Sequence, residues 1–240
     1  MYSVFGVVLV FLLFALTLLY RELRKARHAT FIRDYTLPPG LFEKLRKEHP
    51  QLDLKDCQLV GHALRQFFLC YLKSGKRDVA MPSQAVDDLW HEFILYTRNY
   101  EKFCRRAFGG FLHHTPAVMM ASKAQGKNDG LARCWWQACR EEDINPRLPT
   151  RLPLLFAIDR KLRIEGGFFY LVDCTNEVEL AKVSSLGPIH CATTLATMFP
   201  QRRRGGGGPG CSGSACSGGS HGCSGSGCSG GCGGGCGGGT

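Results

Sequence analysis

Five side chains in the middle of the sequence have the types and spacing of metal ligands. Asp87 and His91 are four residues apart, so on a helix they share one face and the carboxylate can orient the imidazole or bind the same ion. Cys104, His113 and His114 follow, and thiolate and imidazole groups suit zinc or another transition metal. The sequence therefore offers zinc, or another transition metal, as a candidate cofactor.

One long helix would keep two of these ligands apart. We expect a helix that begins after Ser83, its N-cap, and runs to about Phe108, where Gly109-Gly110 ends it. Thirteen residues along such a helix measure about 20 Å. His91 and Cys104 therefore cannot bind one ion unless the helix breaks.

The five ligands are accordingly expected to divide between two sites. The glycine pair can fold the chain back, so that Cys104 meets His113-His114. Asp87 and His91 need a further ligand from another helix, for which His62 is available. The alternative interpretation is structural: the Asp–His pair is a hydrogen bond near a helix end, and the cysteine is a small core residue.

No other motif in the sequence names a reaction. GxSxG, Walker, HExxH and dinucleotide-binding motifs are absent. Six cysteines lie in the C-terminal tail, but none forms the C-x-x-C pair that is commonest in structural zinc sites. A thiol-rich tail can still bind soft metals weakly or react with oxidants, and a purely solvated low-complexity segment is the alternative.

Apolar residues at spacings of three and four predict a mainly α-helical protein with a compact helical body. Besides the helix that follows Ser83, we expect helices over residues 41–49, 53–72 (capped by Asp53), 128–141 and 154–162. Residues 168–172 are expected to form a strand or a buried loop. These helices must position the candidate ligands.

The first twenty residues have the composition of a transmembrane helix. They carry no charge, and at about 1.5 Å per residue they span roughly the 30 Å hydrocarbon core of a bilayer. The first charges follow this run: Arg21, Arg24, Lys25 and Arg27, with Glu22 as the only acid. This imbalance predicts a single-pass inner-membrane protein with its N-terminus outside and its body in the cytoplasm. The alternative is a cleaved signal peptide, in which the charges would precede a shorter apolar run.

Changes in composition divide the chain into four parts. They are a transmembrane anchor (1–20), a basic juxtamembrane linker (21–36), a helical globular domain (37–200) and a Gly/Ser/Cys-rich tail (201–240). The tail lacks the apolar area that would offset the entropy of ordering it, so we expect it to be disordered.

The net charge of +10 and the thirteen cysteines bear on partners and compartment. Aromatic residues do not alternate with the Lys and Arg residues as they do in single-strand binders, so no nucleic-acid partner is expected. The cluster after the anchor and Arg202–Arg204 are instead expected to meet the lipid bilayer and its anionic headgroups. A cytoplasmic body would keep its cysteines reduced, and their odd number, seven, also argues against a bridged framework.

The central motif resembles a known family. Asp87-Asp88-Leu89-Trp90-His91, then Tyr100 with Phe103-Cys104, then His113-His114 are similar to the D-x-x-W-H, Y-x-x-F-C and downstream His of bacterial glycine-rich domain-containing proteins. The resemblance covers about residues 56–116, is weaker around 152–159, and agrees with the Gly-rich tail. It implies no established reaction, but it assigns the family's function to these residues: Trp90, His91, Tyr100, Cys104 and His113 or His114.

Two functions from different classes follow from the sequence. The first is a non-enzymatic, membrane-tethered protein whose helical body is an interaction module for a protein partner, with the tail as a flexible or thiol-bearing arm. The second is a metal-binding protein or metal-dependent enzyme built on the Asp87/His91 and Cys104/His113-His114 groups. The sequence favours the first, and an enzyme is the less favoured alternative.

Overall fold

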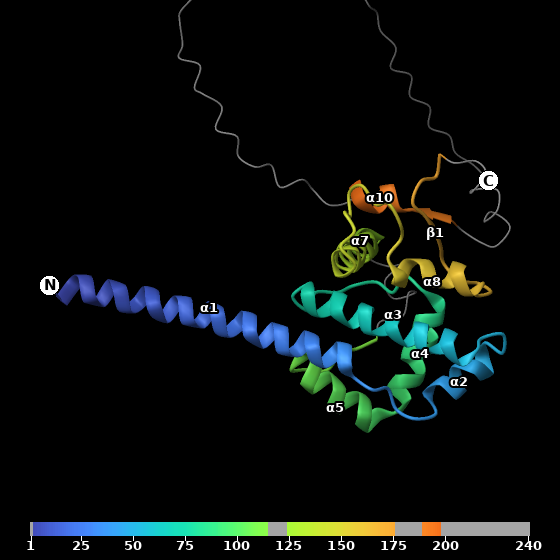
Figure 1. The fold of residues 1–240 in the computed structure, drawn as a ribbon, viewed down its shortest axis with the longest axis horizontal. Helices are drawn as coiled ribbons and strands as arrows, with labels where there is room; N and C mark the ends of the chain where they lie inside the picture. Colours follow the sequence, from blue (N-terminus) through green and yellow to red (C-terminus); the bar gives the residue numbers. More distant parts are fainter. Residues whose placement is uncertain (1, 115–123, 176–188, 198–240) are drawn as a thin grey trace, which may run out of the picture. The chain divides into compact units, whose positions relative to one another are not determined.

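The computed structural model describes residues 2–114, 124–175 and 189–197 (Figure 1). The expectations for the tail, residues 201–240, lie outside the described residues. The helices in chain order are α1 (Tyr2–Asp34), α2 (Leu41–Glu48), α3 (Leu54–Lys73), α4 (Gln84–Leu95), α5 (Thr97–Phe108), α7 (Ala124–Glu141), α8 (Leu154–Leu162) and α10 (Ala192–Thr197). Two short strands, β1 (Phe169–Leu171) and β2 (Ile189–Cys191), complete the described part. The prediction of a mainly helical protein is confirmed.

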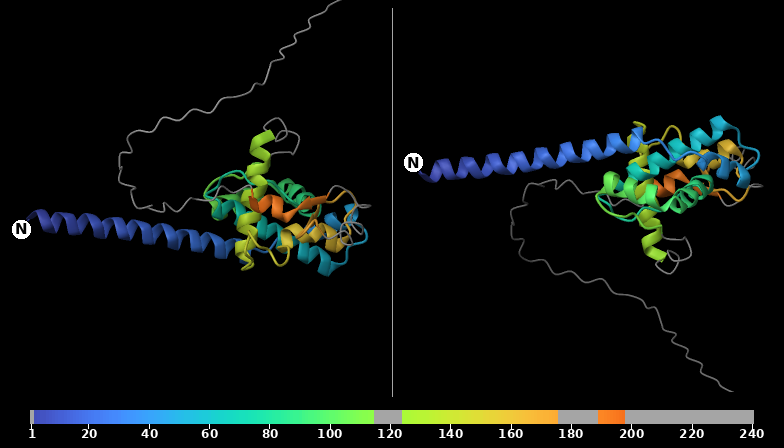
Figure 2. Two further views of the ribbon diagram at one scale, coloured as in Figure 1. Left: turned by 90° about the horizontal axis from the view of Figure 1, so that it is seen from above. Right: turned by 90° about the horizontal axis from the view of Figure 1, so that it is seen from below.

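The N-terminal helix is longer than the expected anchor. Figure 2 shows α1 as one unbroken helix, so residues 21–34, expected to be a linker, are helical. Its last turns are held by packing, because Ala29 and Ile32 are buried and Arg33 donates to a Glu141 carboxylate oxygen at 2.8 Å. The stretch Gly6–Asp34 is long and apolar enough to cross a membrane, by length and composition, and a signal sequence passes the same test.

The helix α3 packs against α1, α2, α4, α7 and α8 and forms the centre of the core. Its start follows the expected local rule, since the Asp53 side chain accepts from the Asp56 amide and Asp56 accepts from the Asp53 amide in a capping box. Aromatic rings from α3, α4 and α5 meet at its centre, with Phe68 and Phe103 centroids 4.9 Å apart.

The prediction of one helix from residue 84 to residue 108 is wrong, because the helix breaks at Tyr96. Phe93 and Phe103 would be about 15 Å apart along a straight helix, yet their ring centroids lie 5.5 Å apart. The turn at Tyr96, with φ −78° and ψ 55°, lets α5 fold back beside α4. Both rings are buried in this arrangement, and burial of their apolar surface favours it.

The strand–loop alternative for residues 168–172 is resolved as strand β1, which pairs in parallel with β2. The pairing brings Cys174 and Cys191 together in a disulfide with 5.9 Å between Cα atoms, a usual spacing for such a bond. The expectation that every body cysteine is reduced is therefore wrong for these two. The other five body cysteines are free and buried: Cys57, Cys70, Cys104, Cys134 and Cys139.

Candidate metal site

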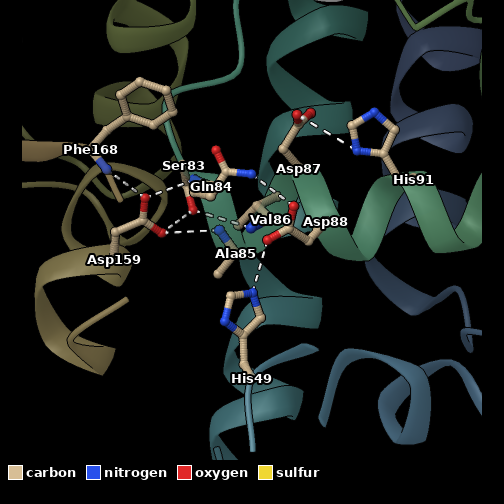
Figure 3. A network of polar contacts seen from close by, with 10 residues as sticks. All are labelled: His49, Ser83, Gln84, Ala85, Val86, Asp87, Asp88, His91, Asp159 and Phe168. Carbon is tan, nitrogen blue, oxygen red and sulfur yellow. Dashed lines mark hydrogen bonds and ion pairs between the residues drawn. The ribbon is translucent and has the colours of Figure 1, made fainter. Parts of the chain in front are cut away.

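A buried carboxylate fixes the start of α4, the helix that carries two of the candidate ligands. Asp159 of α8 is 1% exposed and accepts from Ser83 Oγ at 2.6 Å, from the backbone amides of Gln84 and Ala85 at 2.7 and 3.3 Å, and from the Phe168 amide at 2.9 Å (Figure 3). Ser83 in turn accepts from the Val86 amide as the predicted N-cap. Burial raises the pKa of the Asp159 carboxyl, while these donors stabilise the carboxylate and oppose that shift.

The hydrogen bond from the Phe168 amide to Asp159 requires a glycine at position 167. A Cβ on Gly167 would lie 2.9 Å from Asp159 Cβ and 3.0 Å from the Ile164 carbonyl oxygen. The chain can therefore approach Asp159 closely enough for the Phe168 amide to donate only because residue 167 has no side chain.

The segment after α5 is held against α4 by a buried chain of polar contacts. Trp90 Nε1 donates to the Tyr100 hydroxyl at 3.1 Å, and that hydroxyl donates to the Leu112 carbonyl at 2.6 Å. Both ring side chains are buried, so this chain has no competition from water. It sets the position of His114, whose ring lies edge-on to Trp90 with centroids 4.5 Å apart.

Three of the five candidate ligands meet as a result. His114 Nε2 is 2.9 Å from Asp87 Oδ1, His91 Nδ1 is 3.7 Å from Asp87 Oδ2, and the two imidazole centroids are 4.2 Å apart. One ligand atom from each of the three lies within 4.8 Å of the others. Two ligands of a tetrahedral ion with bonds of 2.0–2.1 Å are about 3.4 Å apart, so small side-chain rotations would suffice to bind zinc.

The surroundings leave this group accessible on one side. The His91 side chain is 52% exposed, whereas those of Asp87 and His114 are 23% and 13% exposed. A site with two imidazoles and one carboxylate supplies three protein ligands and leaves a fourth position open to solvent, a donor set that zinc and iron(II) sites share.

The remaining candidates lie apart from this group. The Cys104 thiol is buried between the Tyr100 side chain and the Leu112 backbone, and burial raises its pKa. His113 is exposed, and its ring contacts that of Phe111 at a tilt, with centroids 4.8 Å apart. His62 is exposed on α3. Among the described residues, none of these three joins a cluster of metal-ligand type.

A second group on the other side of α4 was not expected from the sequence. Glu48, His49 and Asp88 also bring ligand atoms within 4.8 Å. His49 Nε2 is 2.8 Å from Asp88 Oδ2, and Gln84 Nε2 donates to Asp88 Oδ1 at 2.8 Å (Figure 3). Both Asp88 oxygens thus have protein partners. The pKa of Glu48 is raised, first by burial and then by the negative charges of Asp88 and Glu92. These contacts join the end of α2 to α4.

Sequence reasoning also missed Asp159, Gly167 and the structural part that Tyr100 plays. Asp159 lies about 75 residues from the helix it caps, and no spacing rule joins them. The resemblance singled out Tyr100 and grouped it with Trp90 and Cys104, but it did not indicate the hydrogen bonds of the hydroxyl. The structure gives a physical reason for that grouping, because all three contact one another or the Leu112 backbone.

The model of a family described as UCP032817-like matches residues 27–195, more than half of the chain. The chain belongs to the UCP032817-like family. The UCP032817-like region contains all the ligands described above and excludes both the exposed apolar part of α1 and the tail. Comparison with curated proteins and comparison with solved structures find no match.

Proposed function

We propose that this protein binds a transition metal ion, zinc or iron(II), at Asp87, His91 and His114 while α1 holds it at a membrane. The observation that carries the proposal is the convergence of these three side chains from α4 and from the segment after α5. Two imidazoles and a carboxylate are the donors that both ions accept.

The position of His114 supports a built site. Its ring is held by Trp90 at the end of the Trp90–Tyr100–Leu112 hydrogen-bond chain, and Asp87 lies in the first turn of a helix capped by Asp159. Ligands fixed in this way lose little entropy when an ion binds.

The membrane attachment is proposed as a single span with the N-terminus outside and the body in the cytoplasm. Four bases with one acid directly after the apolar run favour this orientation. The Cys174–Cys191 disulfide favours an oxidising compartment. We give the charges more weight, because the bases that follow the apolar run bear directly on orientation, whereas the disulfide is a single bridge in a body that otherwise has five free cysteines among the described residues.

The metal content of the full chain, purified in detergent and dialysed against trace zinc or iron(II), tests the proposal. His114→Ala is expected to lower the bound metal by one ion per chain, while the matched neighbour His113→Ala, outside the group, retains it. Asp87→Asn is expected to lower the bound metal by the same amount relative to wild type. Equal metal content in wild type, H114A and H113A would refute the site, whatever metal the tail cysteines bind.

A second candidate is the interaction module expected from the sequence. Phe111 is 47% exposed and packs on His113 beside the proposed site. Aromatic residues, phenylalanine included, are enriched in protein–protein interfaces. A partner whose binding is lost in Phe111→Ser, in a chain that binds no metal, would favour this second function.

A further inference from the structure

A cleft of about 540 Å³ lies where α1 passes α5. Six residues of α1 and Arg106 of α5 line it. The α1 residues recur at spacings of three and four, from Tyr20 to Phe31, so they form one face of the helix. This face begins where the apolar run ends and continues to the point at which α1 joins the body.

The cleft is basic and holds no acid. Arg24, Arg27 and Arg106 line it together with His28, and no aspartate or glutamate does. The acid nearest in sequence, Glu22, is paired with Lys25 at 2.7 Å and lies outside the lining. Positive charges gathered without a counter-charge of their own attract an anion.

Two of the arginines are held in place by their neighbours. The Arg106 guanidinium lies 4.6 Å from the centroid of the Phe31 ring, and the Arg106 carbonyl oxygen is 2.7 Å from His28 Nδ1. Arg24 Nε is 3.4 Å from His28 Nε2. A guanidinium uses one face for an aromatic ring and keeps its N–H edge for other partners, and that edge matches a phosphate in bidentate geometry.

The apolar part of the lining identifies the kind of anion. Leu23 and Tyr20 are exposed in the cleft and continue the exposed apolar surface of α1. In a bilayer spanned by α1, Tyr20 would lie at the interface between hydrocarbon and headgroups. A ligand at this place meets cations at one end and an apolar helix surface at the other.

We propose that this cleft binds an anionic phospholipid, with its phosphate at Arg24 and Arg106 and its acyl chains along Leu23 and the apolar surface of α1. The proposal rests on the membrane span proposed above. It makes the junction of α1 and α5 a specific lipid site, beyond a general attraction of bases for the membrane surface. Bound lipid would join the anchor to the helix that precedes His114.

Native mass spectrometry of the full chain in detergent tests the site. The chain is mixed with phosphatidylglycerol or with phosphatidylcholine of the same acyl chains, and the fraction that retains lipid is measured. We expect preferential retention of phosphatidylglycerol, with about a tenfold loss of affinity for each of Arg24→Gln and Arg106→Gln, the factor that about 1.4 kcal/mol for a charge-assisted hydrogen bond to phosphate corresponds to. The matched neighbours Lys25→Gln and Arg105→Gln, outside the cleft, should leave retention unchanged.

Three results would overturn the proposal. Equal retention of the two lipids, or equal losses in all four variants, would leave only general charge attraction. Displacement of the lipid by inorganic phosphate would make free phosphate the ligand. Circular dichroism of each variant checks that it is folded. Alkaline carbonate extraction of membranes tests the span separately, because a chain that stays in the membrane without lipid preference loses the cleft proposal alone.

Discussion

Replacing Asp159 by asparagine tests the account of how α4 is positioned. Each carboxylate oxygen accepts two donors: Ser83 Oγ and the Ala85 amide on Oδ1, and the Gln84 and Phe168 amides on Oδ2. Asparagine keeps the shape but turns an NH₂ group toward two of these donors, which are then left without an acceptor in a buried site. The predicted loss comes from these orphaned donors, because the NH₂ group of asparagine cannot accept from them.

Each orphaned buried donor costs about 1–3 kcal/mol; at about 1.5 kcal/mol each, the two donors of D159N lower the unfolding free energy by about 3 kcal/mol. At about 2–4 °C per kcal/mol for a domain of this size, the thermal midpoint should fall by roughly 6–12 °C. Circular dichroism of the detergent-solubilised chain measures it. Asp173→Asn is the matched control, because Asp173 is exposed and, among the described residues, accepts only from Thr175. Midpoints of D159N and D173N that agree within about 2 °C would refute the reasoning.

Three further predictions concern the other features. Tyr100→Phe removes the hydroxyl that joins Trp90 to Leu112, and we expect a loss of about 1–3 kcal/mol in stability with weaker metal binding; a variant with wild-type metal affinity would show that His114 is positioned otherwise. Burial raises the pKa of Cys139 to about 12 and that of Cys70 well above its usual value, so both thiols should resist iodoacetamide at pH 8 in the folded chain and react after unfolding; mass spectrometry of native protein labelled at either position would contradict this. A reporter fused after Thr197 should behave as cytoplasmic, and an exported reporter would reverse the proposed orientation.

Local chemistry made much of the fold predictable. The caps at Asp53 and Ser83 and the starts of α2, α3, α4 and α8 depend on neighbouring residues, and the structure has them where the sequence indicates. The break at Tyr96 depends on the packing of Phe93 against Phe103 after the chain has folded back. No glycine or proline marks it, so periodicity alone extends the helix.

The candidate site was likewise predictable only where it depends on residues close in sequence. Asp87 and His91 follow from helical spacing, and His114 was offered as a ligand but assigned to Cys104. Its actual neighbours depend on the break at Tyr96 and on the hydrogen bond from Tyr100 to the Leu112 carbonyl, neither of which has a signal in spacing. Strand β2 was missed for a similar reason, since three residues form a strand only because β1 is their partner.

X-ray absorption spectroscopy of the zinc-loaded full chain tests the metal site most directly. If Asp87, His91 and His114 bind the ion, the first shell consists of nitrogen and oxygen at about 2.0–2.2 Å, with the outer-shell scattering of two imidazoles. His114→Ala should remove this signal and His113→Ala should leave it. A first shell of sulfur alone, at about 2.3 Å and unchanged in His114→Ala, would place the metal on cysteines and contradict the account.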